Sequence, residues 1–126
     1  MDRIPEEFRD KVIAVDFDGT LFEKKRFPGF GAPNLGLIAT LRFLQKKRGC
    51  KLILWTCREG ADLEMALTAC GGVGLHFDAV NEGLPGENGT SRKISADIYI
   101  DDKAVNPLNQ IPYYLQPEIY SGMREG

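Results

Sequence analysis

Three short apolar runs constrain the fold of this chain more than any other feature of its sequence. None of them alternates apolar with polar residues, as a strand with one face in water would. Uninterrupted runs of this length are typical of strands that are buried on both faces of a parallel sheet. The runs are Val12-Ile13-Ala14-Val15, Leu52-Ile53-Leu54-Trp55 and Ile98-Tyr99-Ile100.

Helical patterns follow the first two runs. Each has apolar residues three or four positions apart, on one face of a helix, and each ends at glycine. A short further strand is expected over 77–80, followed by a loop over 81–89. Alternating strands and helices predict an α/β fold, a Rossmann-like three-layer sandwich with a central parallel sheet and right-handed crossovers. The apolar helix positions are Leu37, Ile38, Leu41 and Leu44 in the first pattern, and Leu63, Ala66, Leu67 and Cys70 in the second.

Length and composition narrow the class of protein. At 126 residues the chain fits one domain, spanning 1–126. A net charge of -2 provides no broad basic surface, so nucleic acid is expected only as a substrate. No apolar run is long enough to span a membrane and no secretory segment is apparent, which favours a cytoplasmic location. The three cysteines lack CxxC spacing, so we expect reduced and mostly buried thiols, with a packing role for Cys57.

Polar residues follow each of the apolar runs. The first run leads into Asp16-Phe17-Asp18-Gly19-Thr20, the second into Thr56-Cys57-Arg58 and the third into Asp101-Asp102-Lys103. Because the carboxyl ends of parallel strands meet at one edge of a sheet, these groups are expected to converge. Clustered carboxylates repel one another unless a cation lies among them, and oxygen ligands without His or Cys favour Mg²⁺.

In this order of motifs, residues 11–103 resemble the haloacid dehalogenase (HAD) superfamily of phosphohydrolases. The shared features are DxDGT at residues 16–20, a strand-end Thr at position 56, an upstream Lys at 93 and an acidic pair at 101–102. The resemblance implies a HAD-like fold and a magnesium-dependent phosphatase. A carboxylate can attack phosphorus to form an acyl phosphate, and Asp16 is the expected nucleophile. Asp18 is the expected general acid and base, as the second Asp is in the family.

The residues that bind the substrate phosphate are predicted from the negative charge of that phosphate. A phosphate dianion needs donors and fixed positive charge around it, and Thr56 and Lys93 are expected to supply them. Arg92 competes with Lys93 for this role. Arg58 is expected either to bind substrate phosphate or to pair with an acid.

The expected metal ligands come partly from the strand ends and partly from the resemblance. Asp101 is expected to bind Mg²⁺ directly, and Asp102 either through water or by orienting Lys93. The resemblance adds Asp16 and the backbone carbonyl of Asp18.

No cap domain is expected, because about 16 residues, from Thr20 to Leu35, separate the first motif from the first helix. That length allows a flap containing Phe27 and Phe30. By family analogy, capless members act on macromolecules or phosphorylated ends, or borrow a partner subunit as a cap. The phosphorylated substrate is either a small molecule or the end of a macromolecule. The sequence also allows oligomerisation, and it allows phosphotransfer in place of hydrolysis.

Two rival readings belong to other functional classes. A catalytically silent module would use the same residues to bind phosphate or a partner. A phosphoacceptor receiver domain carries similar groups, but its acidic pair follows the first strand. Here the DxD motif follows the first predicted strand, and the acidic pair follows the last one.

Overall fold

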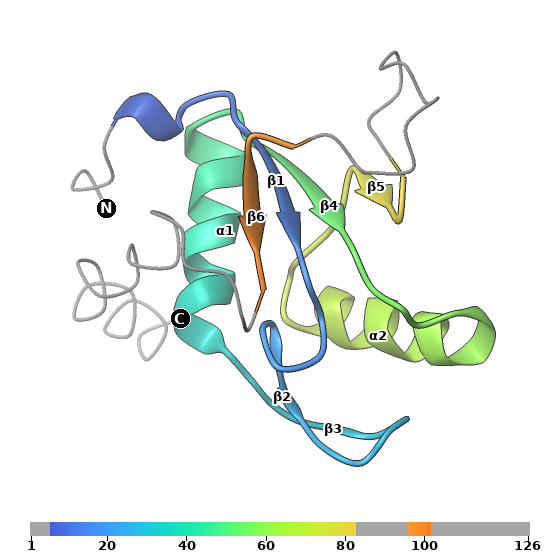
Figure 1. Ribbon diagram of the computed structural model, residues 1–126. Helices are drawn as coiled ribbons and strands as arrows, with labels where there is room; N and C mark the ends of the chain where they lie inside the picture. The colour runs from blue at the N-terminus through green and yellow to red at the C-terminus, as the bar shows by residue number, and fades with distance from the viewer. Residues whose placement is uncertain (1–5, 83–95, 102–126) are drawn as a thin grey trace.

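The computed structural model describes residues 6–82 and 96–101 (Figure 1). Within these two ranges, a short 3₁₀ helix, Glu6–Phe8, precedes the first strand, and two α-helices and six strands follow. The helices are α1 (Leu35–Lys47) and α2 (Gly60–Gly72). The strands are β1 (Val12–Val15), β2 (Phe22–Lys24), β3 (Phe30–Pro33), β4 (Lys51–Leu54), β5 (Ala79–Val80) and β6 (Ile98–Ile100).

The central sheet has the strand order β5-β4-β1-β6, and every pairing in it is parallel (Figure 1). β1 lies between β4 and β6, with Val15 level with both Leu54 and Ile100. The chain moves from β1 through α1 to β4, and through α2 to β5, in one direction across the sheet. The predicted α/β, Rossmann-like fold is confirmed.

Alternate residues of the strands face two separate apolar clusters. Ile13, Val15, Leu52, Leu54 and Ile100 pack with residues of both α1 and α2, so the two helices cover the same face of the sheet. Ala14, Ile53 and Ala79 form a second cluster on the opposite face. Among residues 6–82 and 96–101 no helix packs on this second cluster, so the third layer of the predicted sandwich stays a prediction.

The apolar positions predicted for the helices serve this core. Leu37, Ile38, Leu41 and Leu44 of α1 are fully or almost fully buried, as are Ala66 and Cys70 of α2. Asn34 caps the start of α1, because its side-chain oxygen accepts a hydrogen bond from the Leu37 N–H at 3.2 Å. α1 ends with Lys46 and Lys47, whose charges suit a helix C-terminus.

The segment predicted as a flap contains a second, two-stranded sheet. β2 and β3 pair antiparallel beyond the carboxyl ends of the central strands (Figure 1). Three aromatic rings hold this β2–β3 hairpin to the loop after β1: the Phe17 ring lies 5.0 Å from that of Phe22 and 5.1 Å from that of Phe30. Such aromatic pairs stabilise a small element that backbone hydrogen bonds alone would leave marginal.

Among the described residues, no helix combines the length and the apolar character needed to cross a membrane.

Candidate functional site

The carboxyl ends of β1, β4 and β6 lie side by side and carry three of the predicted site residues. The Asp16 N–H donates to the Ile100 carbonyl at 2.9 Å, so Asp16 lies beside the point where β6 leads into Asp101. On the other side, the Trp55 N–H donates to the Val15 carbonyl at 2.9 Å, and Thr56 follows. The structure therefore brings Asp16, Thr56 and Asp101 to one edge of the sheet.

A tight turn after β1 sets the direction of the two DxD carboxylates. Phe17, between them, is fully buried, and its carbonyl accepts hydrogen bonds from the N–H groups of the three residues 20–22. Gly19 has φ of 81°, a left-handed conformation that glycine adopts without steric cost. The buried ring and the turn fix Asp16 and Asp18 on either side of Phe17.

Thr56 is held through both its backbone and its side chain. Its N–H donates to Asn81 Oδ1 at 2.8 Å, while the Asn81 N–H donates to the Leu54 carbonyl, also at 2.8 Å. The Thr56 hydroxyl oxygen accepts a hydrogen bond from the Arg58 N–H at 3.1 Å. The sequence predicts only a loop at Asn81, but this residue directly follows the short strand β5 and so lies at a strand end, like the other site residues.

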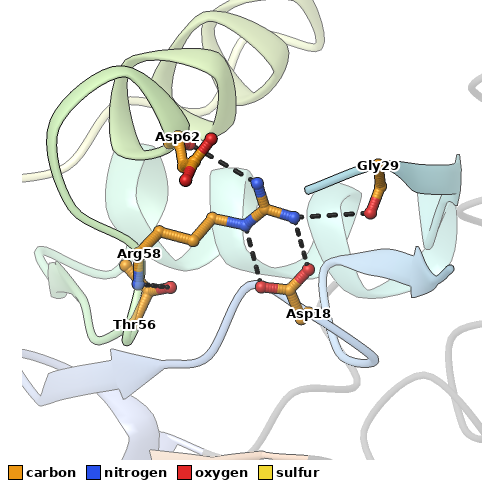
Figure 2. Close-up of polar contacts among 5 residues, drawn as sticks. All are labelled: Asp18, Gly29, Thr56, Arg58 and Asp62. Carbon is orange, nitrogen blue, oxygen red and sulfur yellow. Dashed lines mark hydrogen bonds and ion pairs between the residues drawn. The ribbon is translucent and has the colours of Figure 1, made fainter. Parts of the chain in front are cut away.

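Arg58 forms a two-pronged ion pair with Asp18 (Figure 2). Its Nε lies 2.9 Å from Asp18 Oδ2 and its terminal Nη2 lies 2.7 Å from Oδ1. The Arg58 side chain is 1% exposed and that of Asp18 is 28% exposed. The hydrogen bonding of the Arg58 guanidinium to the Asp18 carboxylate raises the pKa of Arg58, against the opposing effect of burial. Of the two roles expected for Arg58, the structure shows the pairing with an acid.

The same guanidinium also contacts the hairpin and α2. It donates to the carbonyl oxygens of Gly29 and Asp62, both at 3.5 Å (Figure 2). Its central carbon lies 5.1 Å from the ring centroids of both Phe17 and Phe27, close enough for cation–π attraction. Phe30 lies at 5.5 Å. Arg58 therefore joins the β1 loop, the β2–β3 hairpin and the start of α2.

Other predicted residues fall beyond the part of the chain that the structure describes. Lys93, its competitor Arg92 and the second acid Asp102 lie outside the described residues.

Cys57 is described and is exposed, so the packing role expected for it is wrong. Thr56 and Arg58, on either side of it, are both buried, whereas the Cys57 side chain between them lies in solvent.

The donors available for a metal ion are few among the described residues. Within 6–82 and 96–101, no group of three His, Cys, Asp or Glu side chains could hold one. The Asp18 carboxylate is bound to Arg58, so any contribution from Asp18 would come through its carbonyl. Asp16 and Asp101 supply hard oxygen donors on neighbouring strand ends, and Mg²⁺ is usually held by one or two carboxylates with water and phosphate. The donor set fits Mg²⁺.

A separate hollow of about 260 Å³ lies at the base of the hairpin. It contains none of the predicted catalytic or phosphate-binding residues, and its lining is mostly apolar. The lining residues are Gly19, Thr20, Phe22, Glu23, Ala32, Pro33 and Asn34.

Comparison with known proteins gives one informative match. No protein-family model and no curated protein matches the chain. The solved structure of a conserved protein from Bacteroides thetaiotaomicron is 38% identical, with a TM-score of 0.71. The match covers 87% of this chain and 93% of that one.

Proposed function

The chain belongs to the same family as this conserved Bacteroides protein, and we propose that it is a magnesium-dependent phosphatase acting on phosphate monoesters. The observation that carries the proposal is the meeting of Asp16, Thr56 and Asp101 at one sheet edge, beside an Asp18 that Arg58 holds in place. The resemblance to the HAD superfamily supports it with the order of the motifs.

The first chemical step assigned to the site is attack by Asp16. A carboxylate oxygen of Asp16 bonds to phosphorus while the bond from phosphorus to the leaving oxygen breaks, and Asp18 gives its proton to that oxygen. In the second step Asp18 takes a proton from water, the water oxygen bonds to phosphorus, and the Asp16 carboxylate is released. The products are an alcohol and inorganic phosphate.

The pairing with Arg58 does not occupy every lone pair of the Asp18 carboxylate. Each carboxylate oxygen has two lone pairs, and Arg58 uses one on each oxygen. A second lone pair on either oxygen is left for the proton. In this proposal Arg58 is a positioning residue that fixes the Asp18 carboxylate.

Thr56 is suited to donate a hydrogen bond to the phosphate. A hydroxyl group has one proton to donate and two lone pairs, and the Arg58 N–H occupies one lone pair. The O–H proton of Thr56 is then available for a phosphoryl oxygen. Lys93 remains the proposed cation for the same group.

Asp16 and Asp101, with the Asp18 carbonyl, would hold Mg²⁺ in this proposal, and Asp102 would act through water. The metal ion would offset the repulsion between the Asp16 carboxylate and the negatively charged phosphate.

Release of phosphate from an aryl phosphate, measured with and without Mg²⁺, tests the proposal. We expect magnesium-dependent turnover in the parent and a loss of at least about 1,000-fold in Asp16→Asn, because the nucleophile is removed. Asp10→Asn is the matched control, since Asp10 is exposed and precedes β1 at the opposite edge of the sheet. Turnover that persists in Asp16→Asn would reject Asp16 as nucleophile, and binding of phosphate without any turnover would support the silent module instead.

A further inference from the structure

We propose that the tip of the β2–β3 hairpin, residues 24–27, recognises the group attached to the substrate phosphate, and that this group is a nucleoside carrying a second phosphate. The inference rests on the proposed phosphatase function and names its substrate class. Residues 24–27, Lys24-Lys25-Arg26-Phe27, are called the hairpin tip below.

Contacts with Arg58 place the hairpin tip next to the reaction centre. The guanidinium that binds Asp18 at 2.7 and 2.9 Å also donates to the Gly29 carbonyl and lies 5.1 Å from the Phe27 ring centroid. The N–H of Gly29 donates to the Arg26 carbonyl at 2.9 Å, which closes the turn between them. One buried side chain thus fixes the distance between Asp18 and the hairpin tip.

The direction of the reaction puts the leaving group on this side of the phosphate. In phosphoryl transfer the attacking and leaving oxygens lie roughly in line with phosphorus. Asp16 attacks from one side, so the leaving oxygen departs on the other, where Asp18 protonates it. The group carried by that oxygen is therefore adjacent to Asp18 and to the hairpin tip.

Phe27 offers this group an exposed aromatic surface. The ring contacts the Arg58 guanidinium, yet the residue remains 61% exposed. Phe30, which contacts the same guanidinium, packs instead against Phe17 and Phe22. An exposed ring supported by a buried cation is suited to stack on a flat ring of a ligand, as aromatic side chains do on nucleobases.

The positive charge of the hairpin tip suits a substrate that carries a second negative group. Lys24, Lys25 and Arg26 are all exposed, and Lys25 is paired with Glu23 at 2.8 Å. Lys24 and Arg26 leave a net positive charge. The reacting phosphate is held at the strand ends, so these cations suit a further phosphate on the same molecule. Sugar monophosphates lack both the flat ring and the second charge, and phosphotyrosine lacks the second charge.

The test compares kcat/KM across a panel of esters in Mg²⁺. The panel contains an aryl phosphate, a hexose monophosphate, a phosphotyrosine peptide, adenosine 5′-monophosphate, adenosine 3′,5′-bisphosphate and a 5′-phosphorylated oligonucleotide. We expect the last two to exceed the hexose phosphate by about tenfold or more, through a lower KM. A higher value for the oligonucleotide identifies a strand end as the substrate, and a higher value for the bisphosphate identifies a free nucleotide.

Variants assign the preference to the hairpin tip. Phe27→Ala should raise KM for the nucleotide substrates about tenfold relative to KM for the hexose phosphate, whereas Phe27→Trp should retain the preference. Lys24→Glu/Arg26→Glu should raise KM for the same substrates at low salt. The matched control, Lys46→Glu/Lys47→Glu, makes the same charge change at the exposed end of α1 and should have no such effect.

The inference is wrong if the hexose phosphate or the phosphopeptide is preferred, or if Phe27→Ala affects every ester equally. Calorimetry of adenosine 3′,5′-bisphosphate with the Asp16→Asn protein separates recognition from hydrolysis. Binding that Phe27→Ala weakens upholds the recognition site even if the parent hydrolyses no ester, and such an outcome would reject the phosphatase function alone. Binding that is insensitive to the hairpin-tip variants overturns the inference.

Discussion

Arg58 is the side chain on which the arrangement of the site most depends. A guanidinium that is 1% exposed must satisfy its hydrogen-bonding capacity inside the protein, and Asp18 takes the largest share with two short contacts. Three phenylalanine rings surround the rest of the group. A lysine at this position would retain the charge but could not form both contacts in one plane.

Arg58→Met should lower the free energy of unfolding by about 2 kcal/mol, measured by urea denaturation. Breaking a buried pair costs about 3–5 kcal/mol, and the 28% exposure of Asp18 reduces that cost through solvent screening. Arg58→Lys should fall between the parent and Arg58→Met. A free energy of unfolding within about 0.5 kcal/mol of the parent would show that the pair contributes little.

The same variants separate positioning from phosphate binding. Because Arg58 acts through Asp18, Arg58→Met should lower kcat more than it raises KM, with partial recovery in Arg58→Lys. A rise in KM with kcat unchanged would make Arg58 a phosphate ligand instead.

Most residues of the site are predictable from the sequence, but the pairing of Arg58 with Asp18 is not. Asp16, Asp18 and Thr56 were predictable because each follows a buried strand. The Arg58–Asp18 pair joins residues 40 positions apart and depends on side-chain directions that no periodicity encodes. Asn81 was missed because the strand before it is two residues long.

Among the elements, the β2–β3 hairpin has short strands and contacts the site through Arg58. Its strands have three and four residues, and β3 contains both a glycine and a proline. Neither strand shows an alternating pattern, so the sequence predicts a flap here but does not indicate its strands. The strands of the central sheet and both helices were predictable because each carries a buried run or a helical apolar face.

Two phenylalanines of the hairpin should lose different amounts of stability when truncated. Phe30→Ala should cost about 2 kcal/mol of stability, because its ring packs edge-on against Phe17 and Phe22. Phe27→Ala should cost less than about 1 kcal/mol, since the residue is 61% exposed. Thermal unfolding of the two variants side by side measures the difference. Equal losses would mean that the hairpin is held by both rings and that Phe27 is not reserved for a ligand.

At the scale of the whole molecule, the sheet assembles one site from three distant parts of the chain. β1 lies between β4 and β6, so residues near positions 16, 56 and 101 meet at one edge. The rule that ligands bind beyond the carboxyl ends of parallel strands was sufficient to predict this meeting. The strand order itself was not predicted, since short apolar runs carry no information about their neighbours.

Binding of Mg²⁺ together with inorganic phosphate should stabilise the whole fold. A ligand that binds only the native state at about 100 times its Kd adds about 2.7 kcal/mol, which thermal unfolding detects as a higher Tm. We expect the magnesium-dependent part of this shift to vanish in Asp101→Asn and to persist in Asp10→Asn. An equal shift in Asp101→Asn would place the metal ion elsewhere.

The most direct test of the central claim is to trap the intermediate on Asp16. The protein is mixed with substrate and Mg²⁺, quenched in acid during turnover, and digested for mass spectrometry. We predict one added phosphoryl group on the peptide containing Asp16, absent without Mg²⁺ and absent in Asp16→Asn. Turnover with no phosphoryl group on Asp16, in the parent protein under conditions that preserve acyl phosphates, would contradict the account.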